Sequence, residues 1–157
     1  MSQLLQEIES LRQPMKELND FIFDHPELGN EEFQAHELLT NLLEKEGFTV
    51  DREVSGLKTA FRAVYHVNGG GPKIGLLCEY DALEGLGHAC GHNLQGPSIC
   101  TAAIALKRTL QTPCTLVVYG TPAEETASGK LVMAREGVFD DLDIAFMMHG
   151  SDTTTVD

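Results

Sequence analysis

The 157-residue sequence has no tryptophan, and aromatic residues make up only 6% of it. It also lacks any run of 18 apolar residues, which is about the length that a helix needs to cross a bilayer. Residues 1–9 do not combine a basic segment with an apolar one, as a secretory signal does. The sequence therefore predicts no membrane span, and we expect a cytoplasmic protein.

Positive charge is also scarce. Lysine and arginine number 11 against 24 aspartate and glutamate residues, which gives a formal net charge of −13. A field of this sign repels the phosphate backbone of nucleic acids and the surface of anionic membranes. We therefore expect neither nucleic acid nor a membrane as a partner.

The apolar content is ordinary, with 42% hydrophobic and 22% charged residues. A chain of this length and composition is expected to form one domain with a sizeable core. Four cysteines could form disulfides, but a cytosolic chain with a normal apolar fraction does not need them. Three of them are therefore interpreted as small core residues: Cys78, Cys100 and Cys114.

The first 47 residues have apolar side chains at three- and four-residue steps, which is typical of helices. One helix is predicted from about residue 2 to 24, kinked or split by Pro14. A second is predicted from Asn30, as the N-cap, to Gly47. Two histidines beside these helices are interpreted as loop or surface residues: His25 and His36.

From residue 48 onwards, strands alternate with helices. Strands are predicted at 48–50, 60–67, 74–78, 115–120 and 143–148, and helices at 98–110 and 128–137. The last three strands are continuous apolar runs, which indicates burial on both faces of a sheet. The glycine-rich turn at 68–72 leads into a strand and is interpreted as a hairpin rather than a phosphate loop. We expect an α/β layered fold with a mostly parallel central sheet flanked by helices.

Polar side chains follow the three predicted buried strands at the point where each ends. Glu79 and Asp81 follow the first strand, Glu124 and Glu125 the second, and His149 the third. In open α/β sheets, chemistry collects at the carboxyl ends of the strands. Taken alone, the glutamate pair could lie in a solvated turn and His149 could be a core histidine. Because all of these residues follow the ends of predicted buried strands, a common site is favoured.

Residues 78–93 hold two cysteines, two histidines, two glutamates and one aspartate. Cys90 and His92 flank one glycine, so both side chains can reach a single metal centre or a pair of ions. A thiolate and an imidazole suit zinc, and carboxylates also accept manganese or cobalt. A Cys–His nucleophilic dyad is a weaker alternative, because the two residues are too close in sequence to form an oriented pair easily. The other alternative is that Cys90 is a structural cysteine beside a surface histidine, His92.

Four segments in this order resemble the aminoacylase and carboxypeptidase G superfamily of metallopeptidases: 79–83, 87–93, 122–125 and 139–149. Within it, the likeness is to the amidohydrolase branch of aminobenzoyl-glutamate, hippurate and auxin-conjugate hydrolases and aminoacylase-like dipeptidases. The entry segment 25–29 is also similar to that branch. The resemblance covers essentially the whole chain and implies a zinc-exopeptidase-like sandwich.

The resemblance implies two divalent metal ions, expected to be zinc, with manganese or cobalt as alternatives. Cys90 would bridge both ions, His92 and Glu125 would each bind one, and His149 would complete the near shell. The substrate would be a small N-acyl amino acid or dipeptide.

Two further carboxylates receive roles from the same resemblance. Glu124 would be the general base for the attacking water, and Asp81 would orient a metal ligand. The broader superfamily has a ligand histidine where this chain has Glu79, and this departure matches the branch in which the Cys-Gly-His triplet supplies the imidazole.

Members of this superfamily are more than twice as long and form homodimers through an inserted lid domain. Residues 1–157 are therefore expected to be the amino-terminal portion of a catalytic domain, without the lid, the last metal ligand or the substrate-binding residues. The stretch 151–157 has no core-like pattern. The alternative is a catalytically incomplete metal-binding fragment, or one part of a split enzyme.

Overall fold

The computed structural model describes residues 2–151, so most of the stretch 151–157 lies outside the described residues. The helices are α1 (Gln3–Ser10), α2 (Arg12–Asp24), α3 (Phe33–Lys45), the short 3-10 helix η1 (Val54–Gly56), α4 (His92–Thr109) and α5 (Gly129–Arg135). The strands are β1 (Thr49–Arg52), β2 (Phe61–Val67), β3 (Lys73–Cys78), β4 (Cys114–Gly120) and β5 (Ile144–Met147). Among the described helices, none has both the length and the apolar character to cross a membrane.

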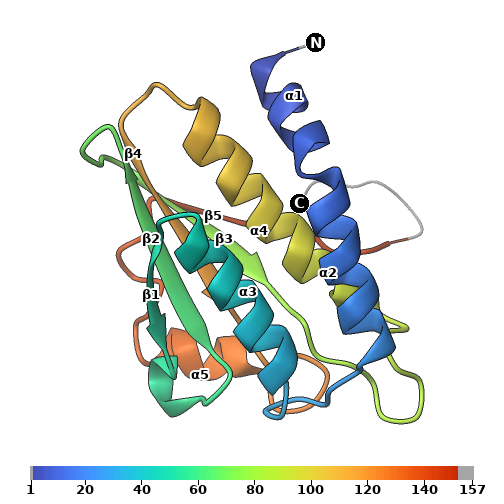
Figure 1. Ribbon diagram of the computed structural model, residues 1–157. Coiled ribbons are helices and arrows are strands. Elements are labelled where there is room, and N and C mark those ends of the chain that lie inside the picture. The colour runs from blue at the N-terminus through green and yellow to red at the C-terminus, as the bar shows by residue number, and fades with distance from the viewer. Residues whose placement is uncertain (1, 152–157) are drawn as a thin grey trace.

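The strands form one sheet in the order β1-β2-β4-β3-β5 (Figure 1). β2 pairs antiparallel with both β1 and β4, whereas β3 pairs parallel with both β4 and β5. Four strands therefore run in one direction and only β2 runs against them. The predicted α/β class with a mostly parallel sheet is confirmed.

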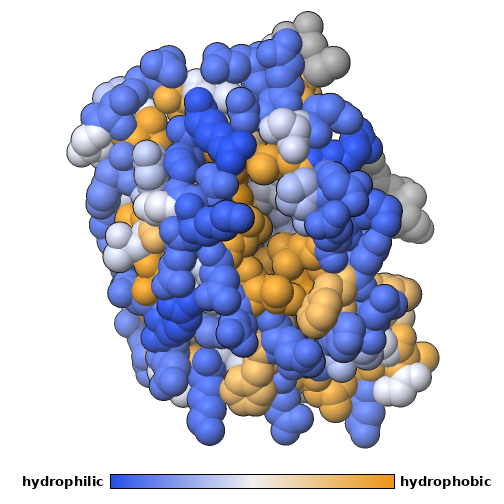
Figure 2. All heavy atoms as spheres, in the orientation of Figure 1, coloured by the Kyte–Doolittle hydropathy of each residue, from blue (hydrophilic) through white to orange (hydrophobic). Residues whose placement is uncertain are grey.

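Helices cover both faces of this sheet. The main core lies between the sheet and α1 to α4, and includes Leu39, Ile104 and Leu116. A smaller core on the opposite face joins Tyr119 of β4 to Met133 of α5. Figure 2 views the side of α1 to α4, where apolar side chains gather between α3 and the α1–α2 pair and polar ones cover most of the rest.

The amino-terminal helix is split, as expected, but the break lies at Leu11 and not at Pro14. Pro14 lies in the first turn of α2, where a backbone N–H has no partner within the helix, so it is tolerated there. The predicted single helix is therefore two helices, α1 and α2, which both pack against α4.

The second helix begins at Phe33 rather than at Asn30. Asn30 has a left-handed backbone with φ of 66°, which is not the extended conformation of an N-cap. The carboxylate of Glu27 caps the helix instead, because it accepts hydrogen bonds from the backbone N–H of Gln34 and Ala35 at 2.9–3.0 Å. This capping residue lies in the loop that precedes the helix.

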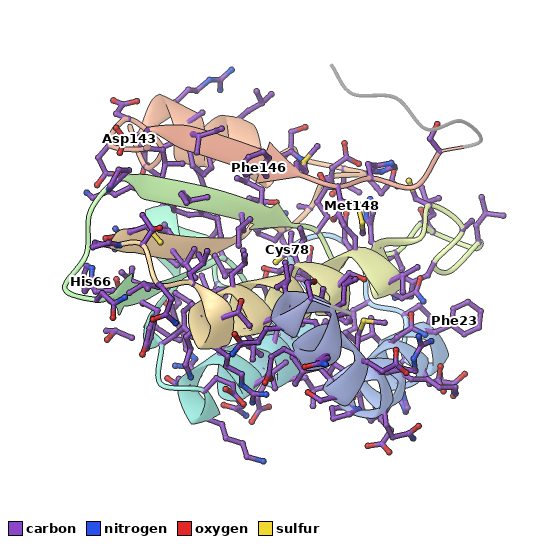
Figure 3. The ribbon with its side chains drawn as sticks, turned by 90° about the horizontal axis from the view of Figure 1, so that it is seen from above. Phe23, His66, Cys78, Asp143, Phe146 and Met148 are labelled. Carbon is purple, nitrogen blue, oxygen red and sulfur yellow. The ribbon has the colours of Figure 1, made fainter. Side chains whose placement is uncertain are left out.

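Two predictions about the sheet were wrong. The turn at 68–72 is not a hairpin, because β4 lies between β2 and β3 and the turn passes over its start. β5 is not buried either, because within residues 2–151 it lies at the edge of the sheet and pairs only with β3. Ile144 and Phe146 are 48% and 52% exposed, and Figure 3 shows Phe146 on this outermost strand.

The cysteine prediction is confirmed, since Cys78, Cys100 and Cys114 are buried free thiols. Cys78 lies in the middle of the molecule in Figure 3. The histidine prediction holds for His25, which is exposed, but not for His36, which is only 9% exposed and packs against the Phe61 ring.

Candidate metal centre

The helix that follows the cysteine-rich segment begins at His92, six residues earlier than predicted. The residue before it, Gly91, has φ of 85°, a left-handed conformation that glycine adopts without strain. The left-handed turn at Gly91 ends the preceding loop, and α4 begins at the next residue. Cys90 therefore lies just outside the helix and His92 in its first turn, and both face the carboxyl ends of the strands.

Cys90, His92 and His149 come together although β5 lies far along the chain. The Cys90 Sγ atom lies 3.5 Å from His149 Nε2, and the two histidine Nε2 atoms are 3.4 Å apart. The rings meet edge to face with centroids 5.5 Å apart. One ligand atom from each residue lies within 4.8 Å of the others. The structure thus brings together three of the residues predicted as ligands.

A second group of ligand atoms shares His92 and includes Glu79 and Glu124, again within 4.8 Å of one another. Glu79 Oε2 lies 3.3 Å from His92 Nε2 and 4.0 Å from His149 Nε2. The sequence placed Glu79 beside Asp81 at the end of the first buried strand, but no ligand role was predicted for it.

Glu79 is held from two sides. The Gln95 side chain, one turn into α4, donates to Glu79 Oε2 at 3.0 Å. The Lys130 ammonium of α5 forms an ion pair with Glu79 Oε1. Burial lowers the pKa of Lys130. Both partners fix a buried carboxylate whose charge would otherwise cost considerable free energy.

Asp81 connects two of the other residues. Its Oδ1 atom lies 3.0 Å from His92 Nδ1, and its Oδ2 atom accepts a hydrogen bond from the backbone N–H of Glu125 at 2.9 Å. A carboxylate on Nδ1 fixes the imidazole so that Nε2 faces the cluster. Burial alone would lower the pKa of His92, but the hydrogen bond and charge of Asp81 outweigh it and raise that pKa.

Glu125 completes the cluster from the loop after β4. Its Oε1 atom lies 4.0 Å from His92 Nε2 and is buried without a hydrogen-bond partner among residues 2–151. Burial and the neighbouring carboxylate of Glu125 raise the pKa of the Cys90 thiol to about 11. The unsatisfied carboxylate oxygen and the crowding of acidic groups are what a cation would relieve.

The donor set fits divalent metal ions. One thiol, two imidazole nitrogens and several carboxylate oxygens converge here, and this mixture of borderline-soft and hard ligands suits zinc and its neighbours in the first transition series. All six predicted site residues lie in or beside the two groups. The structure therefore brings the predicted site residues together at the carboxyl ends of the strands.

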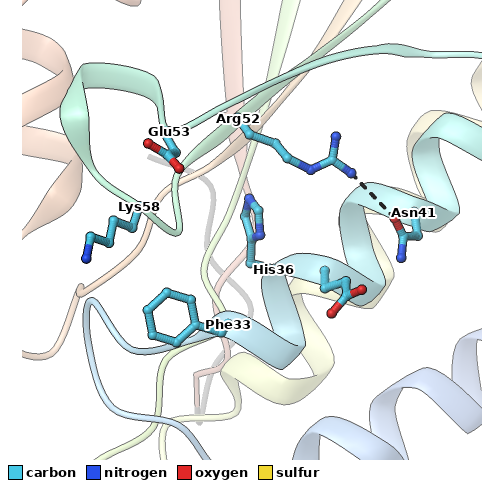
Figure 4. Close-up of a pocket in the computed structure, with 7 residues that line it drawn as sticks. Phe33, His36, Asn41, Arg52, Glu53 and Lys58 are labelled. Carbon is cyan, nitrogen blue, oxygen red and sulfur yellow. Dashed lines mark hydrogen bonds between the residues drawn. The ribbon is translucent and has the colours of Figure 1, made fainter.

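A pocket of about 380 Å³ lies elsewhere, beside α3. Figure 4 shows it between Phe33, His36, Arg52 and Lys58, with Arg52 donating to Asn41. Its charged side chains balance one another, since Glu37 and Glu53 also line it. None of its lining residues belongs to the metal-ligand groups.

Comparison with known proteins connects this arrangement to a family. The sequence model described as peptidase family M20/M25/M40 matches residues 71–157. The chain is 44% identical to one of the subunits of p-aminobenzoyl-glutamate hydrolase of Escherichia coli, over 90% of this chain and 33% of the relative. It is 42% identical to Xaa-Arg dipeptidase of Mus musculus, over 85% of this chain and 34% of the relative.

A solved structure agrees with these sequence matches. A dinuclear metal-binding peptidase of the M20 family from Bacillus subtilis superposes with a TM-score of 0.82 and 26% identity. The match covers 91% of this chain and 44% of that protein. The chain thus spans about a third of the length of the curated relatives described above.

Proposed function

Because the chain belongs to peptidase family M20/M25/M40, we propose that it carries the metal site of an amidohydrolase that cleaves small N-acyl amino acids or dipeptides. The observation that supports this most is the convergence of Cys90, His92 and His149 within 4.8 Å. We further propose that residues 1–157 are the amino-terminal portion of such a catalytic domain, acting in the cytoplasm as part of a homodimer.

In this proposal Cys90, as a thiolate, together with His92, Glu125 and His149 would hold two divalent ions, preferably zinc. The fit is supported by the Glu125 Oε1 atom, which is buried without a hydrogen-bond partner in the described part of the chain. Glu79 Oε2, at 3.3 Å from His92 Nε2, is close enough to compete with or supplement these ligands.

Different side chains have different roles in the proposed amide hydrolysis. The bound ions would lower the pKa of a water and polarise the amide carbonyl. Glu124 accepts the proton of the attacking water and passes it to the leaving amine as the C–N bond breaks. Asp81 keeps His92 Nε2 turned toward the cluster, since it holds Nδ1 at 3.0 Å.

The relatives narrow the substrate class. One is named as part of a p-aminobenzoyl-glutamate hydrolase and another as an Xaa-Arg dipeptidase. Both names describe cleavage of an amide bond next to an amino acid. We therefore propose p-aminobenzoyl-glutamate and Xaa-Arg dipeptides as the first substrates to test.

Metal content and hydrolysis test the proposal together. We expect the purified chain to bind two zinc ions by elemental analysis, and Cys90→Ala to lose tight binding. Hydrolysis of the two substrate types would show that the 157 residues complete their own site. Metal binding without hydrolysis would favour the catalytically incomplete fragment, or one part of a split enzyme. Absence of metal binding would refute the site.

Two isosteric variants separate the proposed roles of the adjacent glutamates. Glu125→Gln should weaken metal binding by about tenfold or more, because it replaces a carboxylate ligand by an amide. Glu124→Gln should retain both ions and lose about a hundredfold or more in turnover, because the general base is gone. The opposite pattern would exchange the two assignments.

A further inference from the structure

Glu32 is a buried carboxylate outside the metal-ligand groups. It lies just before α3 and has no exposed surface. Its Oε1 atom accepts a hydrogen bond from the backbone N–H of Ala123 at 2.7 Å. Ala123 directly precedes Glu124 and Glu125 in the loop after β4. This hydrogen bond therefore fixes the start of that segment, residues 122–125, which we call the acidic loop.

The Glu32 carboxylate is also connected, through hydrogen bonds, to the segment after β3 that carries Glu79 and Asp81. Thr59, also fully buried, donates its hydroxyl to Glu32 Oε2 at 2.7 Å. The Thr59 carbonyl in turn accepts the hydroxyl of Tyr80, which lies between Glu79 and Asp81. A chain of buried hydrogen bonds therefore runs from the end of β3 through Glu32 to the loop after β4.

The loop needs such support. Ala123 has φ of 57°, in the left-handed region that costs a residue with a Cβ atom free energy unless its surroundings hold it there. The segment that carries Glu32 also packs directly on the loop. A Cβ atom added at Gly29 would lie 2.3 Å from Thr126 Oγ1 and 2.8 Å from the Ala123 Cα atom. The contact is too close for any side chain at Gly29.

Two buried carboxylates thus accept hydrogen bonds from backbone N–H groups of this loop, one on either side of a single residue. Glu32 accepts from Ala123 N, and Asp81 accepts from Glu125 N at 2.9 Å. The residue between them is Glu124. We propose that Glu32 is a positioning residue that sets the acidic loop, and so the placement of Glu124 and Glu125, in the metal site whose function is proposed above.

Amide hydrogen exchange by NMR tests this in metal-free protein. Glu32→Ala should speed exchange at Ala123 and Glu125 by about tenfold or more relative to Val118 in the centre of β4, because a buried hydrogen bond is lost. Glu32→Gln retains an oxygen acceptor for Ala123 N and can donate to the Thr59 hydroxyl. It should therefore stay within about threefold of the wild type.

The matched control is Glu27→Ala. The Glu27 carboxylate caps the same end of α3, and within residues 2–151 it accepts from α3 N–H groups and the Gln34 side chain and not from Ala123. It should lower global stability without a selective effect at Ala123. Unchanged Ala123 exchange in Glu32→Ala, or the same selective loss in Glu27→Ala, would overturn the proposal.

Zinc titration links this result to the site. If the wild type binds zinc, Glu32→Ala should weaken binding by about tenfold and Glu32→Gln should restore it to within about threefold. Equal affinity in all three proteins would contradict a positioning role in the metal site. If the wild type binds no zinc, the proposed function fails, while the exchange data still decide whether Glu32 sets the loop.

Discussion

At the scale of single residues, three acidic side chains are almost completely buried: Glu32, Glu79 and Asp81. Each has polar partners. Burying a carboxylate without partners would cost far more free energy than a single hydrogen bond contributes. Glu79 has an ammonium partner, Lys130, whereas the partners of Glu32 among the described residues are uncharged: the Thr59 hydroxyl and backbone N–H groups, including that of Ala123. Burial raises the pKa of Glu32, and its hydrogen bonds oppose this only in part.

This difference predicts a pH effect for Glu32→Gln. Since the folded-state pKa of Glu32 lies above the unfolded value of 4.5, its contribution to stability is fully present below pH 4.5 and is lost as pH rises through the folded pKa. Glutamine does not titrate. The free energy of unfolding of the variant, relative to wild type, should therefore rise with pH by at most about 1.4 kcal/mol per unit in that window.

Urea unfolding of both proteins at a series of pH values measures this difference directly. The comparison cancels the other titrating groups, because the two proteins share them. A difference that stays constant with pH would mean that burial does not disfavour the charged form of Glu32.

At the scale of elements, α4 is the centre of the molecule. It contacts α1, α2, α3, β3 and β4, and its first residue is His92. The helix therefore joins the core to the metal-ligand groups, and any loss of packing along it should reach both.

Ile104→Ala tests this packing. Ile104 is buried in the main core, and the truncation should lower the free energy of unfolding by about 2–5 kcal/mol because it leaves a cavity. Leu94→Ala is the control on the same helix, since Leu94 is 47% exposed. It should cost less than about 1 kcal/mol. Similar losses for the two variants would contradict the placement of the core.

Strand ends and buried thiols could be predicted from the sequence because they depend on local apolar runs. Those runs located β3 and β4 to within one residue at either end, and so placed Asp81 and Glu125 correctly. Strand neighbours could not be predicted in this way. The apolar run of β5 is the same whether the strand lies inside the sheet or at its edge, and only pairing decides which.

The missed helix starts have a similar cause. Glu27 caps α3 from the preceding loop, and Gly91 starts α4 before the apolar pattern begins. Both depend on backbone conformations that the spacing of apolar residues does not encode. The position of Glu79 at a strand end was predicted but its place among the ligand atoms was not, because that depends on Gln95 and Lys130, which approach it from two other elements.

At the scale of the whole molecule, β5 leaves one side of the sheet unpaired within the described chain. Its apolar side chains, including Ile144 and Phe146, are about half exposed. An open edge with apolar side chains favours pairing with another strand.

Phe146→Lys should therefore reduce self-association of the 157-residue chain, because an edge charge opposes strand pairing. Light scattering over a range of concentrations measures the change, and we expect the wild type to associate more. Phe23→Lys is the control, since Phe23 is 58% exposed on α2, away from this edge. If both variants act alike, general surface hydrophobicity and not the strand edge drives association.

The parallel pairing of β3 with β5 also sets an order of events during synthesis. His149 lies 57 residues after His92, so at about 5–20 residues per second a ribosome needs roughly 3–11 s to add it. Parallel strands far apart in sequence then pair slowly, because a long loop must close first. During this interval the Cys90 thiol has emerged without His149 beside it. Metal delivery before β5 docks would meet an incomplete set of the proposed ligands, so loading of the proposed centre should follow, and report, the docking of β5.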